Sequence, residues 1–83
     1  LYSDHPHPDI AGGLYNLGSD YQALGENVRA IEYFEQSLTI NKQIHGDQPH
    51  PEIAMSLINL GSTYNELGEA ARAIEYLEQS LAM

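Results

Sequence analysis

Two asparagines, Asn16 and Asn59, are the residues of this chain whose chemistry is easiest to interpret. A side-chain amide both donates and accepts hydrogen bonds, so it can pair with a peptide group whatever side chain stands beside that group. Each of the two asparagines precedes a leucine, and they stand 43 residues apart. This pattern favours recognition of a peptide main chain. The alternative is that asparagine is simply tolerated on a polar helix face.

Residues that could catalyse a reaction or hold a metal ion are missing or poorly spaced. The chain has no cysteine nucleophile, no glycine-rich phosphate loop and no pair of carboxylates set among apolar residues. The four histidines fall in or beside predicted loops, away from Ser19 and Ser62, and no HxxxH ligand spacing occurs. His7 and His50 are better explained as loop residues before prolines. The sequence therefore predicts no enzyme activity, no cofactor and no metal site.

The elements that must position the asparagines belong to an internal repeat. When the chain is aligned with itself at a shift of 43 residues, positions 4–40 fall on positions 47–83, and 24 of these 37 positions are identical. Periods of this length are typical of solenoids, in which each unit buries its apolar face against its neighbours. Two units are fewer than the roughly three that such arrays usually need, so we expect marginal stability or self-association.

Each unit is predicted to contain two helices. In the first helix of each unit, apolar residues recur at steps of three and four: Ile10, Leu14, Leu17, Tyr21 and Leu24, and then Ile53, Leu57, Leu60, Tyr64 and Leu67. A His-Pro-acid sequence opens this helix, since proline suits the first helical turn, and Gly25 or Gly68 ends it.

These signals predict where the units lie. We expect unit one at 8–46, with helices at about 8–24 and 26–45, and a loop at 47–50. Unit two is expected at 51–83, with helices at about 51–67 and 69–82. Residues 1–7 are interpreted as the end of a preceding repeat, so we expect the chain to be a segment of a longer array.

The residues that recur at fixed places in both units resemble the tetratricopeptide repeat (TPR) pattern. In unit one these residues are Leu14-x-x-Leu17-Gly18-x-x-Tyr21, then Gly25, Ala30, Phe34 and Ser37, and in unit two they are Leu57, Leu60-Gly61, Tyr64, Gly68, Ala73, Leu77 and Ser80. The length of the unit and its His-Pro opening are similar to the kinesin-light-chain type of this family. The resemblance implies an all-α fold, with antiparallel helix-turn-helix repeats stacked as a right-handed superhelical α-solenoid. Asn27 and Ala70 depart from the pattern, which usually has an aromatic residue at this place.

The resemblance also implies a binding site, because the first helix of each TPR unit lines a concave groove. We predict that the peptide-binding residues lie on this nearly uncharged face: Tyr15, Asn16, Ser19, Gln22, Met55, Ile58, Asn59, Ser62 and Asn65. In the family, an asparagine at the place of Asn16 and Asn59 often holds the ligand backbone. The family's clamp for C-terminal carboxylates uses lysine and arginine, which these positions lack, so no such binding is expected. We therefore expect a protein-interaction module that binds an extended peptide, neutral or basic rather than acidic.

The charge of the chain argues against several other partners. Twelve acidic residues oppose three basic ones, which gives a net charge of -9. Nucleic acids and anionic membrane surfaces both attract basic surfaces, so neither is an expected partner. No apolar run reaches the roughly 20 residues that span a bilayer. We expect a soluble, cytoplasmic protein.

Structural self-assembly is the alternative function. Apolar faces at the two ends of the repeat pair would be buried if copies stacked head to tail or exchanged helices, which would make a homo-oligomer. At the C-terminal end we expect this face to contain Ala73, Tyr76, Leu77 and Ser80. At the N-terminal end we expect Ile10, Leu14 and Tyr21.

Overall fold

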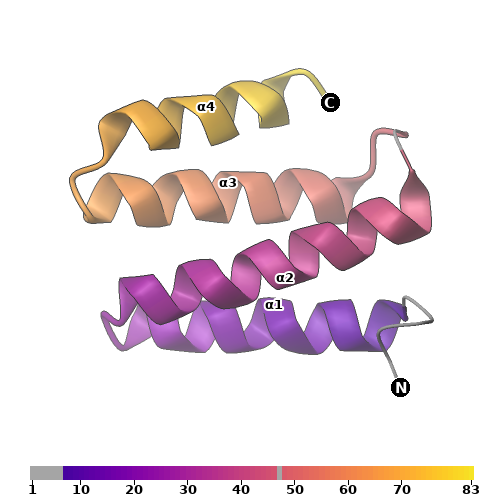
Figure 1. Cartoon of the computed structure of the whole chain (residues 1–83), viewed down its shortest axis with the longest axis horizontal. Coiled ribbons are helices and arrows are strands. Elements are labelled where there is room, and N and C mark those ends of the chain that lie inside the picture. The colour runs from indigo at the N-terminus through magenta and orange to yellow at the C-terminus, as the bar shows by residue number, and fades with distance from the viewer. Residues whose placement is uncertain (1–6, 47) are drawn as a thin grey trace.

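The computed structural model describes residues 7–46 and 48–83, so the expected end of a preceding repeat lies almost entirely outside the described residues. These residues form four α-helices: α1 (Pro8–Ala23), α2 (Asn27–His45), α3 (Pro51–Glu66) and α4 (Ala70–Leu81). The helices lie side by side in chain order and alternate in direction (Figure 1), and each packs against the next. The fold is therefore the predicted all-α stack of antiparallel helix pairs. None of the four helices in the described part of the chain is long and apolar enough to cross a membrane.

A histidine caps the start of the first helix in each pair. His7 and His50 have extended backbones and are the N-cap residues of α1 and α3. Their Nδ1 atoms accept hydrogen bonds from the backbone N–H groups of Asp9, at 3.1 Å, and Glu52, at 3.2 Å. Each histidine thus satisfies an N–H group that the start of a helix leaves without an intrahelical partner. The sequence pattern predicts loops at these histidines and does not indicate this capping role.

A glycine ends the first helix of each pair, as the sequence predicts. Gly25 and Gly68 both have a φ of 80°, a conformation that a residue with a Cβ atom rarely adopts. The N–H of Glu26 then donates to the carbonyl oxygen of Tyr21 at 2.9 Å, and the equivalent bond recurs in the second pair. This is a Schellman-type helix end. It reverses the chain within three residues and starts the second helix antiparallel to the first.

Glycines also let the two helices of each pair approach closely. A Cβ atom at Gly18 would lie 2.8 Å from two ring carbons of Phe34, and a Cβ atom at Gly61 would lie 2.6 Å from Cγ of Leu77. Phe34 is fully buried at the first crossing, and Leu77 is half-buried at the second. Any larger residue at either glycine would separate the helices or displace these side chains.

Equivalent residues in the two pairs differ in exposure, and this difference identifies the surface that joins the pairs. Leu60 of α3 is fully buried, whereas its counterpart Leu17 of α1 is 42% exposed. Leu38 of α2 is 8% exposed, whereas its counterpart Leu81 of α4 is 86% exposed. Because α2 packs against α3, the outer side of α2 and the facing side of α3 are both covered. The apolar stripe predicted for both first helices is therefore buried far more completely in α3 than in α1.

The most exposed apolar side chains of α4 are not those expected to stack on a further copy. Ala73 is 2% exposed because it packs within its own helix pair, and Tyr76 is half-buried. The exposed side chains of this helix include Ile74, Glu78 and Leu81, which follow one another at steps of four and three. Ala73 is thus already covered, whereas Tyr76, Leu77 and Ser80 are half-buried and keep exposed area, so the expected stacking face of α4 stays a prediction.

Candidate peptide-binding face

The predicted binding residues lie on α1 and α3, and two side-chain hydrogen bonds connect them across the boundary between the units. The amide of Asn59 donates to the hydroxyl of Tyr15 at 2.5 Å. The amide of Gln22 donates to the hydroxyl of Ser62 at 3.4 Å. Both bonds run between α1 and α3, so the first helices of the two units share one polar face. Four of the predicted residues are thereby brought into contact.

Tyr15 fixes the position of the Asn59 side chain. The ring of Tyr15 packs against the buried ring of Phe34, with centroids 5.5 Å apart and planes tilted by 58°. Asn59 is half-buried, and its amide has one further N–H and a carbonyl oxygen beyond the bond to Tyr15. Asn16, its counterpart in α1, is exposed. The two repeated asparagines therefore lie in different environments, one held in place and one facing solvent.

Apolar side chains lie among the polar groups of this face. Met55 and Ile58 are 47% and 48% exposed. Ser62 and Asn65 are exposed beside them, whereas Ser19 is half-buried. The face thus combines apolar contact area with uncharged donors and acceptors of hydrogen bonds.

A shallow depression lies where this face meets α4. Its walls are formed by Ile58, Ser62, Asn65, Glu66 and Leu77. Ile58 and Asn65 are the repeat counterparts of Tyr15 and Gln22, which contact α3 at the boundary between the units. On unit one, α3 covers this place. On unit two the equivalent place is open, and the depression lies there.

A second group of side chains joins the two units through an acidic residue. Tyr64 and Tyr76 stack with ring centroids 5.5 Å apart, and Arg72 lies over the ring of Tyr64. Glu35 of α2 accepts a hydrogen bond from the hydroxyl of Tyr76 at 2.9 Å and a longer one from Tyr64 at 3.5 Å. An acid from unit one thus binds the aromatic pair of unit two.

Unit one contains the same aromatic arrangement. Tyr21 stacks on Tyr33 with centroids 5.4 Å apart, and Arg29 lies over the ring of Tyr21. The sequence pattern does not by itself mark Glu35 as a contact between the units. The signal that could have found it is the recurrence of this glutamate with two tyrosines and an arginine at the 43-residue period.

Burial raises the pKa of Tyr76 to about 12, because removal from water disfavours the phenolate. The hydrogen bond to Glu35 and the negative charge of Glu35 add to this effect. The pKa of Arg72 is raised above its usual value by its hydrogen bond to Tyr64. At neutral pH the group therefore contains a neutral phenol that donates to Glu35 and a guanidinium that is fully charged.

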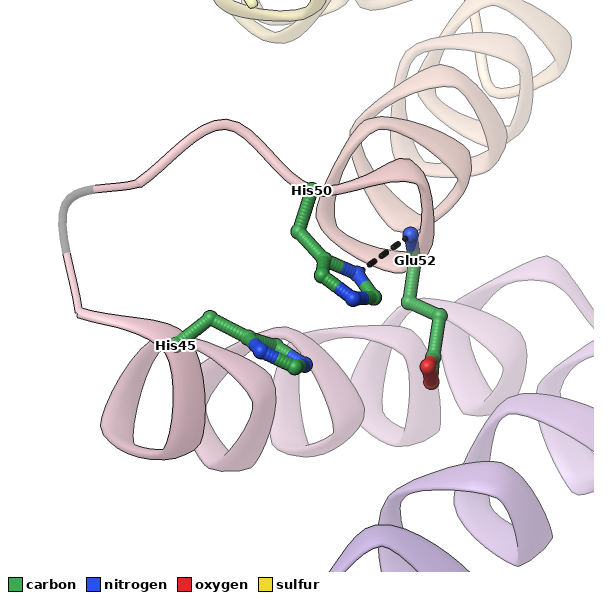
Figure 2. A group of neighbouring side chains, drawn as sticks. All are labelled: His45, His50 and Glu52. Carbon is green, nitrogen blue, oxygen red and sulfur yellow. Dashed lines mark hydrogen bonds between the residues drawn. The ribbon is translucent and has the colours of Figure 1, made fainter.

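The loop between α2 and α3 brings together three residues of types that bind metal ions. His45 ends α2, His50 precedes α3 and Glu52 lies in the first turn of α3, and each has a potential ligand atom within 4.8 Å of the others. Figure 2 shows the two imidazole rings one above the other, with the Glu52 side chain beside them. The ring centroids are 3.6 Å apart and the ring planes differ by 14°. No metal site is predicted from the sequence, because these three residues come from the end of α2 and the start of α3 and not from regular spacing along one helix.

Comparison with known proteins gives a family but no individual relative. Among curated proteins and among solved structures, no match to the chain was found. Residues 9–83 match the family model described as a tetratricopeptide repeat, and this range includes all four helices except the first residue of α1. The chain therefore belongs to the tetratricopeptide repeat family, a non-catalytic repeat family whose members generally mediate protein–protein interactions and typically bind proteins or peptides.

Proposed function

We propose that the chain binds an extended segment of a partner protein along the face formed by α1 and α3, and that it acts by binding and not by catalysis. In this proposal Asn16 and Asn59 pair with main-chain groups of the segment. The observation that carries the proposal is the hydrogen bond from Asn59 to Tyr15. This bond orients an amide on the face before a partner arrives, which lowers the entropy lost on binding.

The composition of the face supports an extended ligand. An extended segment has unpaired N–H and C=O groups along its length, and its side chains point alternately to opposite sides. The asparagine amides can pair with the main-chain groups. The exposed side chains of Met55 and Ile58 offer apolar contact to the side chains of the segment that point toward the face.

The charge of the chain favours a neutral or basic segment. The nine predicted residues carry no charge, so the long-range field is set by the net charge of -9. Such a field slows the approach of acidic segments and speeds the approach of basic ones, and salt weakens both effects. A basic ligand should therefore associate more slowly as the salt concentration rises.

A peptide selection tests this proposal. Peptides would be selected by display against the monodisperse protein, and their affinities measured by fluorescence polarisation. We expect one extended motif, and we expect the Asn16→Ala/Asn59→Ala double variant to bind it about thirtyfold more weakly, because each of the two lost hydrogen bonds contributes about 1 kcal/mol. Tyr15→Phe should cause a smaller loss, since it removes only the group that orients Asn59.

The matched control places the same change on the second helices. Gln36 and Gln79 are exposed amides at equivalent positions of α2 and α4. The Gln36→Ala/Gln79→Ala double variant should bind the selected peptides with unchanged affinity. If the selected peptides bind both double variants as tightly as the parent chain, their binding site lies elsewhere and the proposal is contradicted. The proposal is also contradicted if only the Gln36→Ala/Gln79→Ala variant binds them more weakly.

Self-association is the second candidate function, and the contact made by Glu35 favours it. The repeat counterpart of Glu35 is Glu78, which is exposed on the outer face of α4. The counterpart of the aromatic pair that Glu35 binds is the stack of Tyr21 and Tyr33 in unit one, with Arg29 beside it. In a head-to-tail stack, Glu78 of one copy would meet this stack in the next copy. Acid and arginine are complementary in charge at such a contact.

Sedimentation velocity over a range of protein concentrations tests the second candidate. Stacking should give a sedimentation coefficient that rises with concentration, because a heterologous contact does not close on itself. Ile74→Lys, on the exposed outer face of α4, should abolish this rise. Val28→Lys, on an exposed part of α2, should leave it unchanged. A coefficient that is the same at all concentrations would exclude self-association.

A further inference from the structure

We propose that His45, His50 and Glu52 form a binding site for a divalent transition-metal ion, for which zinc is the reference ion. The donors are two imidazole nitrogens and one carboxylate oxygen. This set suits zinc and its neighbours in the first transition series, whereas magnesium and calcium prefer oxygen ligands alone. The ion would connect the end of α2 to the start of α3, and hence one unit to the next.

The three side chains are close enough to reach one ion after a small movement. Their ligand atoms lie within 4.8 Å of one another. Zinc binds nitrogen and oxygen ligands at about 2.0–2.2 Å, so two ligands of a tetrahedral ion are about 3.3 Å apart. The stacked rings are nearly parallel, with centroids 3.6 Å apart. Because the nitrogen lone pairs lie in the ring planes, one ring must rotate out of the stack before both nitrogens point at the same ion. Glu52 is exposed, so its side chain can rotate toward that ion.

Metal binding must compete with the cap of α3. His50 Nδ1 accepts a hydrogen bond from the N–H of Glu52 at 3.2 Å, so the proton of the neutral ring sits on Nε2. A bond from the metal to Nδ1 would use the lone pair that accepts this hydrogen bond. A bond to Nε2 would displace its proton, and the proton of the neutral ring would then occupy Nδ1. In either case the backbone N–H of Glu52 loses its acceptor, which provides a specific signature of binding.

The local charges partly favour a cation. The carbonyl end of α2, where His45 lies, carries a partial negative charge, and Glu52 adds a carboxylate. The amino end of α3 opposes the cation with a partial positive charge. The ion therefore needs both histidines, and a site that lacks one of them should bind it far more weakly.

Unit one supplies a matched control for this site. His7 caps α1 through the N–H of Asp9, as His50 caps α3 through the N–H of Glu52. The repeat counterpart of His45, however, is Tyr2. The same His-Pro-acid motif thus occurs once with a histidine at the position of His45 and once with a tyrosine there.

Calorimetric titration of the whole chain with zinc chloride near neutral pH tests the proposal. We expect one ion per chain, and an affinity at least about tenfold lower in His45→Ala, since even the loss of an outer partner of a metal ligand costs that much. His50→Asn should show a similar loss while it retains a good capping side chain. His7→Ala should bind zinc as the parent chain does. Equal affinities for His45→Ala and His7→Ala would overturn the proposal, and so would magnesium binding as tight as zinc binding.

Amide resonances give a second and independent test. Zinc should shift the backbone amide resonance of Glu52 and increase its hydrogen exchange, because this N–H loses the His50 acceptor. The amide of Asp9 should not respond. A zinc titration that leaves the Glu52 amide unchanged would overturn the proposed site even if some zinc binds.

Discussion

Tyr76 of the second repeat donates a hydrogen bond of 2.9 Å to the carboxylate of Glu35 in the first repeat. The acceptor is charged, and hydrogen bonds to charged groups are stronger than those between neutral groups. The same carboxylate also accepts a longer hydrogen bond, of 3.5 Å, from the hydroxyl of Tyr64. One acidic side chain therefore connects α2 of unit one to α3 and α4 of unit two. Loss of this contact should therefore report how much the interaction between the two repeats contributes to the stability of the chain.

The first prediction is that removing the Tyr76 hydroxyl destabilises the chain. Tyr76→Phe keeps the aromatic ring on Tyr64 and removes only the hydrogen bond to Glu35, so we expect the free energy of unfolding in urea to fall by about 0.5–1.5 kcal/mol. Tyr33→Phe makes the same change at the equivalent place of unit one and should have little effect. If both variants lose the same free energy of unfolding, the loss comes from removing any tyrosine hydroxyl and not from breaking the contact between the units.

The second prediction concerns the pH dependence of this contact. The pKa of Tyr76 is raised from 10.0 to about 12 in the folded chain. A group whose pKa is higher in the folded state contributes stability that is fully present below the pKa of the unfolded state, and this contribution is lost as the pH rises through the folded pKa. The contribution of Tyr76 should therefore be complete at neutral pH and should disappear between pH 10 and about 12.

Urea unfolding measured at about pH 8 and again at about pH 11 checks this dependence. The parent chain should lose more stability between these two conditions than Tyr76→Phe does. The other tyrosines contribute equally to both proteins and cancel in the difference. A parent chain and a Tyr76→Phe variant with identical pH dependence would show that the Tyr76 phenol does not carry the effect.

The helices could be predicted from the sequence because their signals are local and occur twice. Proline fixes the first turn of α1 and α3, and Gly25 and Gly68 end these helices with a positive φ that the residue type indicates in advance. The expected helix ends differ from those in the structure by at most one residue. Gly18 and Gly61 also recur at the 43-residue period, and each lies where the two helices of its pair approach closely.

The contacts between the units could not be predicted in the same way. Leu17 and Leu60 occupy identical sequence surroundings, yet one is 42% exposed and the other is buried, because burial depends on which helix lies alongside. The hydrogen bond between Tyr15 and Asn59 joins side chains of different units, and no local spacing encodes it. The candidate binding face was therefore predictable as a set of residues on two helices, but the internal bonds that orient it were not.

The third prediction is that a methyl group at Gly18 destabilises the first helix pair. An added Cβ atom would lie 2.8 Å from the ring of Phe34, which is fully buried and cannot move aside easily. Overpacking of this kind costs about 1–3 kcal/mol, which should exceed the gain of about 1 kcal/mol that alanine brings to a helix interior. Gly18→Ala should thus lower the urea midpoint. An unchanged or higher midpoint would mean that the helices of the pair separate without cost.

Gly12→Ala is the control for this substitution, since a Cβ atom at Gly12 meets no atom within 4 Å. Gly12 lies in the same helix and is exposed. The variant should therefore gain stability, by about 0.5–1 kcal/mol, because alanine loses less backbone entropy than glycine on folding. Opposite signs for two glycine-to-alanine changes in one helix would separate packing from helix propensity.

The fourth prediction concerns the turn that reverses the chain after α3. Gly68 has a φ of 80° and no atom within 4 Å of an added Cβ, so any cost of substitution comes from the backbone and not from packing. The left-handed conformation costs a residue with a Cβ atom about 1–2 kcal/mol. Gly68→Ala should lose about this much stability, whereas Gly68→Asn should lose less because asparagine tolerates this conformation better. Equal losses for alanine and asparagine in urea unfolding would indicate that the turn changes its conformation, so that α4 no longer returns along α3.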